Sequence, residues 1–158
     1  MTVDRSAIGR SNRRTGHETE RQVVRWLRAN GFPDACTTRS KLGHDGFRQP
    51  GDVDWHPLVV LEVKSATSGS AWPTWCRQAV AQAGPGQVPC VVRRTRGVPD
   101  VGQWEVRVRA FESIVVLQHR SGGRWLTGDP HVDGWPWMSM TMADLVELVR
   151  AVDEDGAA

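Results

Sequence analysis

The stretch LVVLEVK, Leu58–Lys64, predicts the buried strand around which the fold is built. The run is apolar and partly β-branched, which is typical of a strand covered on both faces. Side chains alternate between the two faces of a strand, so Glu62 and Lys64 are expected to point the same way. The earlier positions on that face, Leu58 and Val60, are apolar. An acid and an ammonium are therefore expected together at the end of a buried strand.

Helices and strands are expected on both sides of this run. Two capping-box patterns, Thr15-x-x-Glu18 and Thr141-x-x-Asp144, predict the starts of the first and last helices. The expected elements are a helix over 15–30, short strands over 35–39 and 53–55, the strand over 58–64, a helix over 71–83, strands over 88–93 and 104–109, and a helix over 141–153. Residues 110–118 fit either a helix or a strand, and 121–137 are expected to form a loop. This order predicts a mixed α/β sandwich.

Length and charge predict one domain with charged ends. The chain has 158 residues, of which 39% are apolar, enough for one modest core. Residues 1–48 carry ten Lys or Arg against five Asp or Glu, whereas 129–158 carry one against seven. We expect a flexible basic arm over 1–14, a single domain over 15–153 and a disordered tail over 154–158. The basic front indicates a polyanion-binding face, and ordinary surface charge is an equal alternative.

Several protein classes are excluded by composition. The cysteines, Cys36, Cys76 and Cys90, are odd in number and include no CxxC, which argues against a disulfide framework or a zinc site. The five histidines show no metal-ligand spacing and are expected at surface or loop positions. The chain has no signal peptide and no apolar run near 18 residues, so no membrane span is expected. The expected location is the reducing cytosol of a bacterium or of a phage-infected host.

The residues that carry chemistry lie in Gly51-Asp52-Val53-Asp54 and Glu62-Val63-Lys64. Asp52, entering from a neighbouring strand, is expected to bring its carboxylate beside Glu62. Two carboxylates this close repel each other unless a cation lies between them. Oxygen ligands and high negative charge favour Mg²⁺, or Mn²⁺, over zinc. The backbone carbonyl of Val63 is a further candidate ligand.

Phosphodiester hydrolysis requires a site of this kind. A metal neutralises charge that develops on phosphorus and lowers the pKa of the attacking water. Lys64 supplies a compact charge that can orient this water or stabilise the transition state. A carboxylate is also expected on the inner face of the first helix, because Glu20 precedes Val23, Val24 and Leu27 with helical spacing. A buried carboxylate is costly without a cation or hydrogen bonds nearby.

With these residues the chain resembles the PD-(D/E)xK nuclease superfamily, and within it the Holliday junction resolvase-like members, which include many small phage nucleases. The resemblance covers about residues 15–93. It is carried by Glu20, Asp52, Glu62-x-Lys64 and Gln78. The first dipeptide is Gly51-Asp52 rather than Pro-Asp, and Asp54 is a competing acid on the same strand face.

The resemblance implies a restriction-endonuclease-like fold, a mixed central sheet flanked by helices. It also implies that the three acids handle metal, that Lys64 acts at the water and that Gln78 assists near phosphate. The implied activity is Mg²⁺-dependent endonuclease action in DNA recombination or repair, at branched DNA such as a Holliday junction. Paired symmetric cuts imply a homodimer. The expected DNA-binding residues are basic residues near the site in sequence, Arg13, Arg14, Arg39, Lys41 and Arg48.

Each of these residues also has a simpler structural interpretation. Glu62 and Lys64 can be an ordinary ion pair where a strand reaches solvent, Glu20 can lie on the helix surface, and Gln78 can be a solvated glutamine. Three further functions compete with junction cleavage. The first is a phage or repair nuclease that acts on ends, flaps or nicks. The second is a restriction-type enzyme, which would need a base-reading element that the sequence does not indicate. The third is a DNA-binding module that keeps the fold and does not cut.

Overall fold

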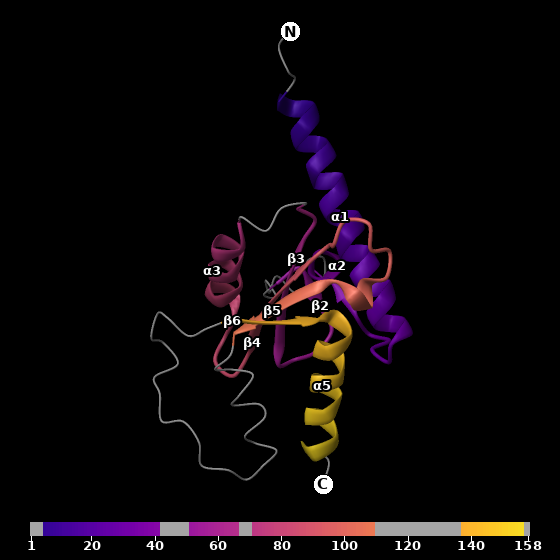
Figure 1. Ribbon diagram of the computed structural model, residues 1–158, viewed down its shortest axis with the longest axis vertical. Helices are drawn as coiled ribbons and strands as arrows, with labels where there is room; N and C mark the ends of the chain where they lie inside the picture. The colour runs from indigo at the N-terminus through magenta and orange to yellow at the C-terminus, as the bar shows by residue number, and fades with distance from the viewer. Residues whose placement is uncertain (1–4, 42–50, 67–70, 110–136, 157–158) are drawn as a thin grey trace.

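A six-stranded mixed sheet with helices on both faces forms the body of the protein (Figure 1). The computed structural model describes residues 5–41, 51–66, 71–109 and 137–156. The coarse prediction of a mixed α/β fold is therefore confirmed. The ambiguous stretch 110–118, most of the loop expected over 121–137, and Arg48 lie outside the described residues.

The elements follow the predicted order closely from β1 to β5. Three elements were not predicted: a short helix after β1, a 3-10 helix before β5 and a last strand before the final helix. In chain order the elements are α1 (Arg5–Ala29), β1 (Cys36–Thr37), α2 (Thr38–Lys41), β2 (Val53–Asp54), β3 (Val59–Lys64), α3 (Trp72–Gln82), β4 (Val88–Arg93), the 3-10 helix η1 (Val101–Gln103), β5 (Glu105–Arg109), β6 (Trp137–Thr141) and α5 (Met142–Gly156).

The strands lie side by side in the order of the chain, from β1 to β6. Among these described strands only β3 and β4 are parallel, with Glu62 opposite Val91 and Lys64 opposite Arg93. The crossover between them is α3, as a parallel pair requires. The other neighbours are antiparallel, and β2 contributes a single pair, Val53 with Leu61. Because β2 pairs so briefly, most backbone N–H and C=O groups on this edge of β3 need hydrogen-bond partners outside β2.

Two apolar clusters lie on opposite faces of the sheet. The larger one joins α1 and α5 to the sheet and includes Leu27, Leu61 and Leu145. The smaller one joins α3 to Val91 on β4. Glu62 and Lys64 pair in register with Val91 and Arg93 of the parallel neighbour, so they face the α3 side. The side chains of Glu62 and Lys64 thus project from the face of β3 opposite the larger apolar cluster.

The first helix begins ten residues earlier than expected. The predicted flexible arm over 1–14 is wrong for residues 5–14, which form the first turns of α1. Thr15 is therefore not a helix cap, and its carbonyl accepts a hydrogen bond from the Thr19 hydroxyl at 2.9 Å. Residues 5–14 contain no proline, and adding turns to a helix already anchored by packing costs little. A capping pattern can therefore occur inside a helix that begins further upstream.

The C-terminal end differs in a similar way. The Thr141-x-x-Asp144 capping box is confirmed, because the Asp144 N–H donates to the Thr141 hydroxyl at 3.2 Å and the Thr141 N–H donates to the Asp144 carboxylate at 2.9 Å. The helix that it opens runs to Gly156, so the disordered tail predicted from 154 begins too early.

In the described part of the chain, no helix has the length and apolar character needed to cross a membrane.

Candidate active site

Glu62 and Lys64 lie in contact at the end of β3. The Lys64 ammonium donates to Glu62 Oε1. The side chain of Glu62 is 8% exposed and that of Lys64 is 20% exposed, so the pair lies below the surface but remains open to a ligand. This is not the solvated pair expected where a strand simply reaches solvent.

Asp52 is held against the edge of β3 by the backbone. Its carboxylate Oδ2 accepts a hydrogen bond from the Val63 N–H at 2.8 Å, and its own N–H donates to the Leu61 carbonyl at 2.8 Å. The side chain therefore replaces the backbone acceptor that the short β2 strand does not provide. Asp54 lies one step further along β2, opposite Cys36. The structure thus brings Asp52, rather than Asp54, to Val63.

Glycine is required at the residue before Asp52. Gly51 has a φ of +83°, which L side chains rarely adopt, and an added Cβ would lie 2.8 Å from the Leu61 carbonyl oxygen. Thr38 fixes this turn from the other side, because its hydroxyl donates to the Gly51 carbonyl at 3.0 Å and its N–H donates to the Asp52 carbonyl at 3.1 Å. The turn places the Asp52 carboxylate within reach of β3.

The glutamine that reaches the site is Gln82, not Gln78. Gln82 Nε2 donates to Glu62 Oε2 at 3.2 Å, and its Oε1 accepts from the Gly51 N–H at 2.6 Å. Among the described residues Gln78 is exposed and makes no hydrogen bond to this group. The two glutamines are one helical turn apart and share a face of α3, so sequence spacing alone does not choose between them.

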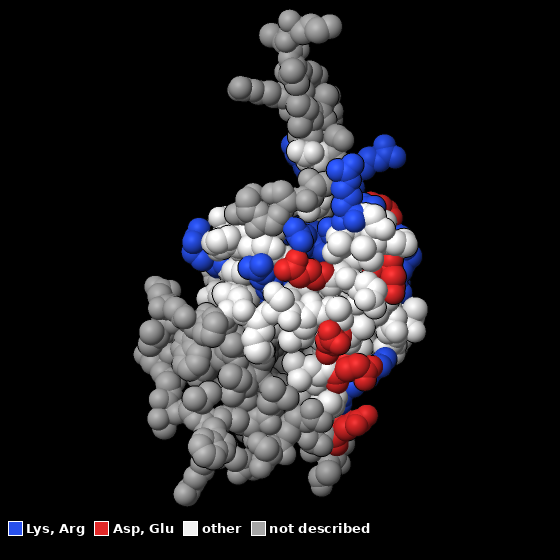
Figure 2. All heavy atoms as spheres, in the orientation of Figure 1, with Lys and Arg blue, Asp and Glu red and all other residues white. Residues whose placement is uncertain are grey.

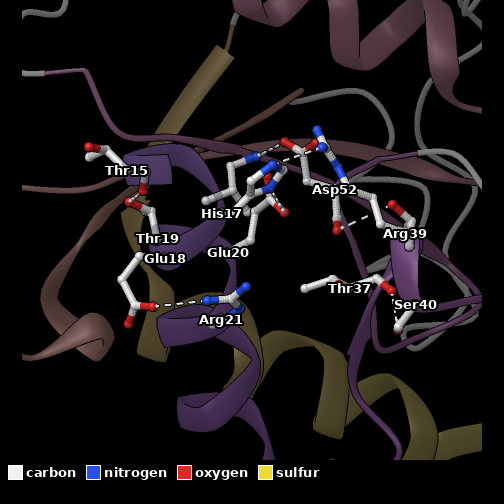
Figure 3. A network of polar contacts seen from close by, with 12 residues as sticks. Thr15, His17, Glu18, Thr19, Glu20, Arg21, Thr37, Arg39, Ser40 and Asp52 are labelled. Carbon is white, nitrogen blue, oxygen red and sulfur yellow. Dashed lines mark hydrogen bonds and ion pairs between the residues drawn. The ribbon is translucent and has the colours of Figure 1, made fainter. Parts of the chain in front are cut away.

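Glu20 reaches the site from α1, as expected from its helical spacing. It is 6% exposed. Figure 3 shows Glu20 and His17 on α1 on the side that faces Asp52 and Arg39. Arg39 Nη1 lies 3.0 Å from His17 Nε2, and His17 Nδ1 lies 3.5 Å from Glu20 Oε2. Since a guanidinium only donates, His17 Nε2 accepts and the ring proton lies on Nδ1, facing Glu20.

His17 was expected to be an ordinary surface histidine, and sequence reasoning did not connect it with the site. The signal available was its position three residues before Glu20, which places both side chains on one helix face. Thr38 had no comparable signal, because its contacts join residues that are far apart in the sequence.

The acids act on one another electrostatically. The pKa of Asp52 is raised from 3.8 to about 6, first by burial, then by the negative charge of Glu62, with a smaller contribution from Glu20. The Val63 N–H and the Lys64 ammonium lower this pKa in part. Asp52 therefore lies where negative charge is in excess, and a bound cation would relieve this repulsion.

The donor atoms suit a hard divalent cation. Asp52, Glu62 and Glu20 offer carboxylate oxygens only. The N–H and C=O of one strand residue point toward the same edge, so the Val63 carbonyl also faces Asp52. Within the described ranges, no three His, Cys, Asp or Glu side chains converge as a ready-made metal site. The residues fit Mg²⁺ or Mn²⁺ in charge and donor type.

The predicted DNA-binding residues separate into two sets. Arg13, Arg14 and Arg39 are exposed on the side of the molecule that carries His17. Lys41 ends α2, and its side chain, like all of Arg48, lies outside what the structure describes.

Comparison with known proteins does not assign a family. No protein-family model matches the chain, and no solved structure matches it. Among curated proteins, the chain is similar to a benzyl alcohol O-benzoyltransferase of Petunia hybrida, with 35% identity over 79 residues. This similarity covers 50% of the chain and 16% of the relative. The chain thus corresponds to a small part of that protein, and the match bears neither for nor against a nuclease.

Proposed function

We propose that this protein is a metal-dependent endonuclease that hydrolyses DNA phosphodiesters, built on a restriction-endonuclease-like fold. The observation that carries the proposal is the placement of Asp52 against Val63, beside the Glu62–Lys64 pair. Two acids and an ammonium, from β3 and from the turn before β2, thus lie together at one strand end. The element order from α1 to β4, with β3 carrying Glu62-x-Lys64, supports the same fold.

Mg²⁺, when bound, would neutralise charge developing on phosphorus and lower the pKa of the attacking water. Asp52, Glu62 and Glu20 would hold the cation through their carboxylates, together with the Val63 carbonyl. Lys64 projects from the same face of β3 as Glu62, where its ammonium can orient a water or stabilise a phosphoryl oxygen. Gln82 joins Glu62 to the Gly51 turn and so fixes the acids relative to each other.

Branched DNA is the first candidate substrate, and a homodimer follows if two symmetric cuts are made. Both parts of this proposal rest on the sequence resemblance. The decisive experiment compares a labelled four-way junction with the matching linear duplex, with Mg²⁺ and with EDTA. The variants are wild type, Lys64→Ala and Glu62→Gln, with Arg77→Ala as an exposed control on α3.

Cleavage that needs Mg²⁺, is lost in both site variants and is kept in Arg77→Ala is the expected result. Paired cuts in the junction alone support a resolvase. Cutting of both substrates keeps the nuclease and removes the junction preference. Binding without cleavage, with Mg²⁺ or Mn²⁺, overturns the enzyme proposal in favour of a DNA-binding module.

A further inference from the structure

Two basic hollows border the candidate active site, and residues of α1 line both. The first, of about 350 Å³, is lined by Arg13, Arg14, His17 and Arg21. The second, of about 530 Å³, is lined by Thr15, Ser65 and the turn over residues 94–99, which includes Arg94 and Arg96. Figure 2 shows several Lys and Arg side chains near the base of α1, with some Asp and Glu side chains among them and others along α5.

Both hollows are joined to the acidic site through neighbouring residues. On the first side, His17 lines the hollow and contacts Glu20 at 3.5 Å. On the second side, Ser65 directly follows Lys64, and the Arg94 N–H donates to the Lys64 carbonyl at 2.8 Å. Thr15 lies five residues before Glu20, which is about 7.5 Å along a helix. Each hollow therefore borders a residue of the candidate site, Glu20 on the first side and Lys64 on the second.

The charge of the second hollow is not balanced locally. Arg94 and Arg96 are exposed, and within the described ranges neither has a carboxylate partner. By contrast, Arg25 on α1 is paired with Glu18 at 2.8 Å. An uncompensated pair of guanidiniums beside a concave surface suits an anion with several charged oxygens, because guanidinium donors match phosphate geometry.

We infer that the hollow at residues 94–99 binds a backbone phosphate of the nucleic acid on the far side of the cut from the Arg13–Arg21 hollow. One strand would then run from one basic hollow, across the acids, to the other. A strand held on both sides of the scissile bond is cut internally rather than at its end. The inference rests on the proposed function for the identity of the polyanion, and it assigns Arg94 and Arg96 a role that no sequence motif indicates.

The test measures binding without cleavage. A fluorescently labelled linear DNA duplex is titrated in EDTA with wild type, Arg94→Ala/Arg96→Ala and the control Arg25→Ala, at several salt concentrations. We expect the double variant to lose about tenfold or more in affinity, because charged hydrogen bonds are lost. Its log–log salt dependence should become shallower by about 0.9, the change expected when one phosphate contact is removed. Arg25→Ala should match wild type in the salt slope.

A second arm tests the path of the strand. Wild type with Mg²⁺ is expected to cut a covalently closed circular plasmid that carries an extruded inverted repeat, a substrate with a four-way junction and no ends. The double variant is expected to cut it more slowly. Unchanged affinity and salt slope in the double variant overturn the assignment of this hollow, and cleavage that still depends on Lys64 then leaves the proposed function intact. Conversely, a salt slope that depends on Arg94 and Arg96, found without any cleavage, supports phosphate binding by this hollow and overturns the proposed nuclease activity.

Discussion

The Asp52 carboxylate accepts a hydrogen bond from the backbone N–H of Val63 at 2.8 Å and thereby completes the edge of the central strand. The same side chain serves the fold and the candidate site. Its burial beside Glu62 and near Glu20 raises its pKa, so the metal-free protein carries a carboxylate in an unfavourable place. The cost of this arrangement is expected to be measurable in the absence of any substrate.

The stability of the metal-free protein should depend on the protonation of Asp52. Its pKa is 3.8 in the reference state and about 6 in the folded protein, so the folded state holds the proton more tightly. The resulting stabilisation is fully present below the lower value and is lost as the pH rises through about 6. Asp52→Asn carries no charge and can still accept from Val63. In EDTA, we expect the variant to melt a few degrees above wild type at neutral pH.

Thermal melts of both proteins between about pH 4 and about pH 7.5 check this expectation. The difference in Tm should shrink toward the acidic end, where the wild-type carboxyl is protonated. A difference that does not change with pH would show that Asp52 is not the group responsible.

Gly51 should tolerate substitution less well than another glycine of similar backbone conformation. Gly51→Ala introduces a strained φ and a Cβ 2.8 Å from the Leu61 carbonyl oxygen. Gly86 has a φ of +76° with no atom within 4 Å of an added Cβ, so Gly86→Ala isolates the backbone strain. We expect Gly86→Ala to cost about 1–2 kcal/mol, and Gly51→Ala to cost about 1–3 kcal/mol more.

Urea denaturation of the two glycine variants measures this difference. Gly51→Ala should also lose DNA cleavage at temperatures where it is still folded, since the turn that carries Asp52 has moved. Equal stability of the two variants would mean that the Gly51 turn is not closely packed against β3.

Gln82 should matter for activity and Gln78 should not. Gln82→Ala removes the links to Glu62 and to the Gly51 turn, and such positioning contacts typically contribute about 10–100-fold to metal affinity or activity. Gln78→Ala, one turn away and exposed, should change the rate by no more than about twofold. Single-turnover cleavage at a series of Mg²⁺ concentrations checks both variants. A positioning role predicts that part of the Gln82→Ala defect is rescued by more metal, which a fault in folding would not show.

The capping box at Thr141 should stabilise the protein without affecting catalysis. Thr141 accepts from the Asp144 N–H, so Thr141→Ala leaves an unpaired donor at the start of α5. We expect a loss of about 1 kcal/mol in the free energy of unfolding. Ser139→Ala, at an exposed position two residues earlier on β6, is the control and should stay within about 0.5 kcal/mol of wild type. A loss in the control as large as that of Thr141→Ala would assign the effect to the strand.

Three features could be predicted from the amino-acid sequence: the central strand, the placement of Glu62 and Lys64 on one face of it, and the inward position of Glu20. These follow from local periodicity, because side chains alternate along a strand and recur every three or four residues along a helix. The strand over 88–93 was predicted with the boundaries that β4 shows, and α3 was predicted to within one residue at each end.

The contacts between distant residues could not be predicted, because they arise from how the elements pack. Gln82 contacts Glu62 across 20 residues of chain, and Thr38 contacts Gly51 across 13, so no local pattern records either contact. The choice of Asp52 over Asp54 depends on the Val63 N–H, whose need for an acceptor arises only because β2 pairs with β3 so briefly. The basic hollow at Arg94 and Arg96 likewise exists only because α1 and the 94–99 turn, far apart in the sequence, pack side by side.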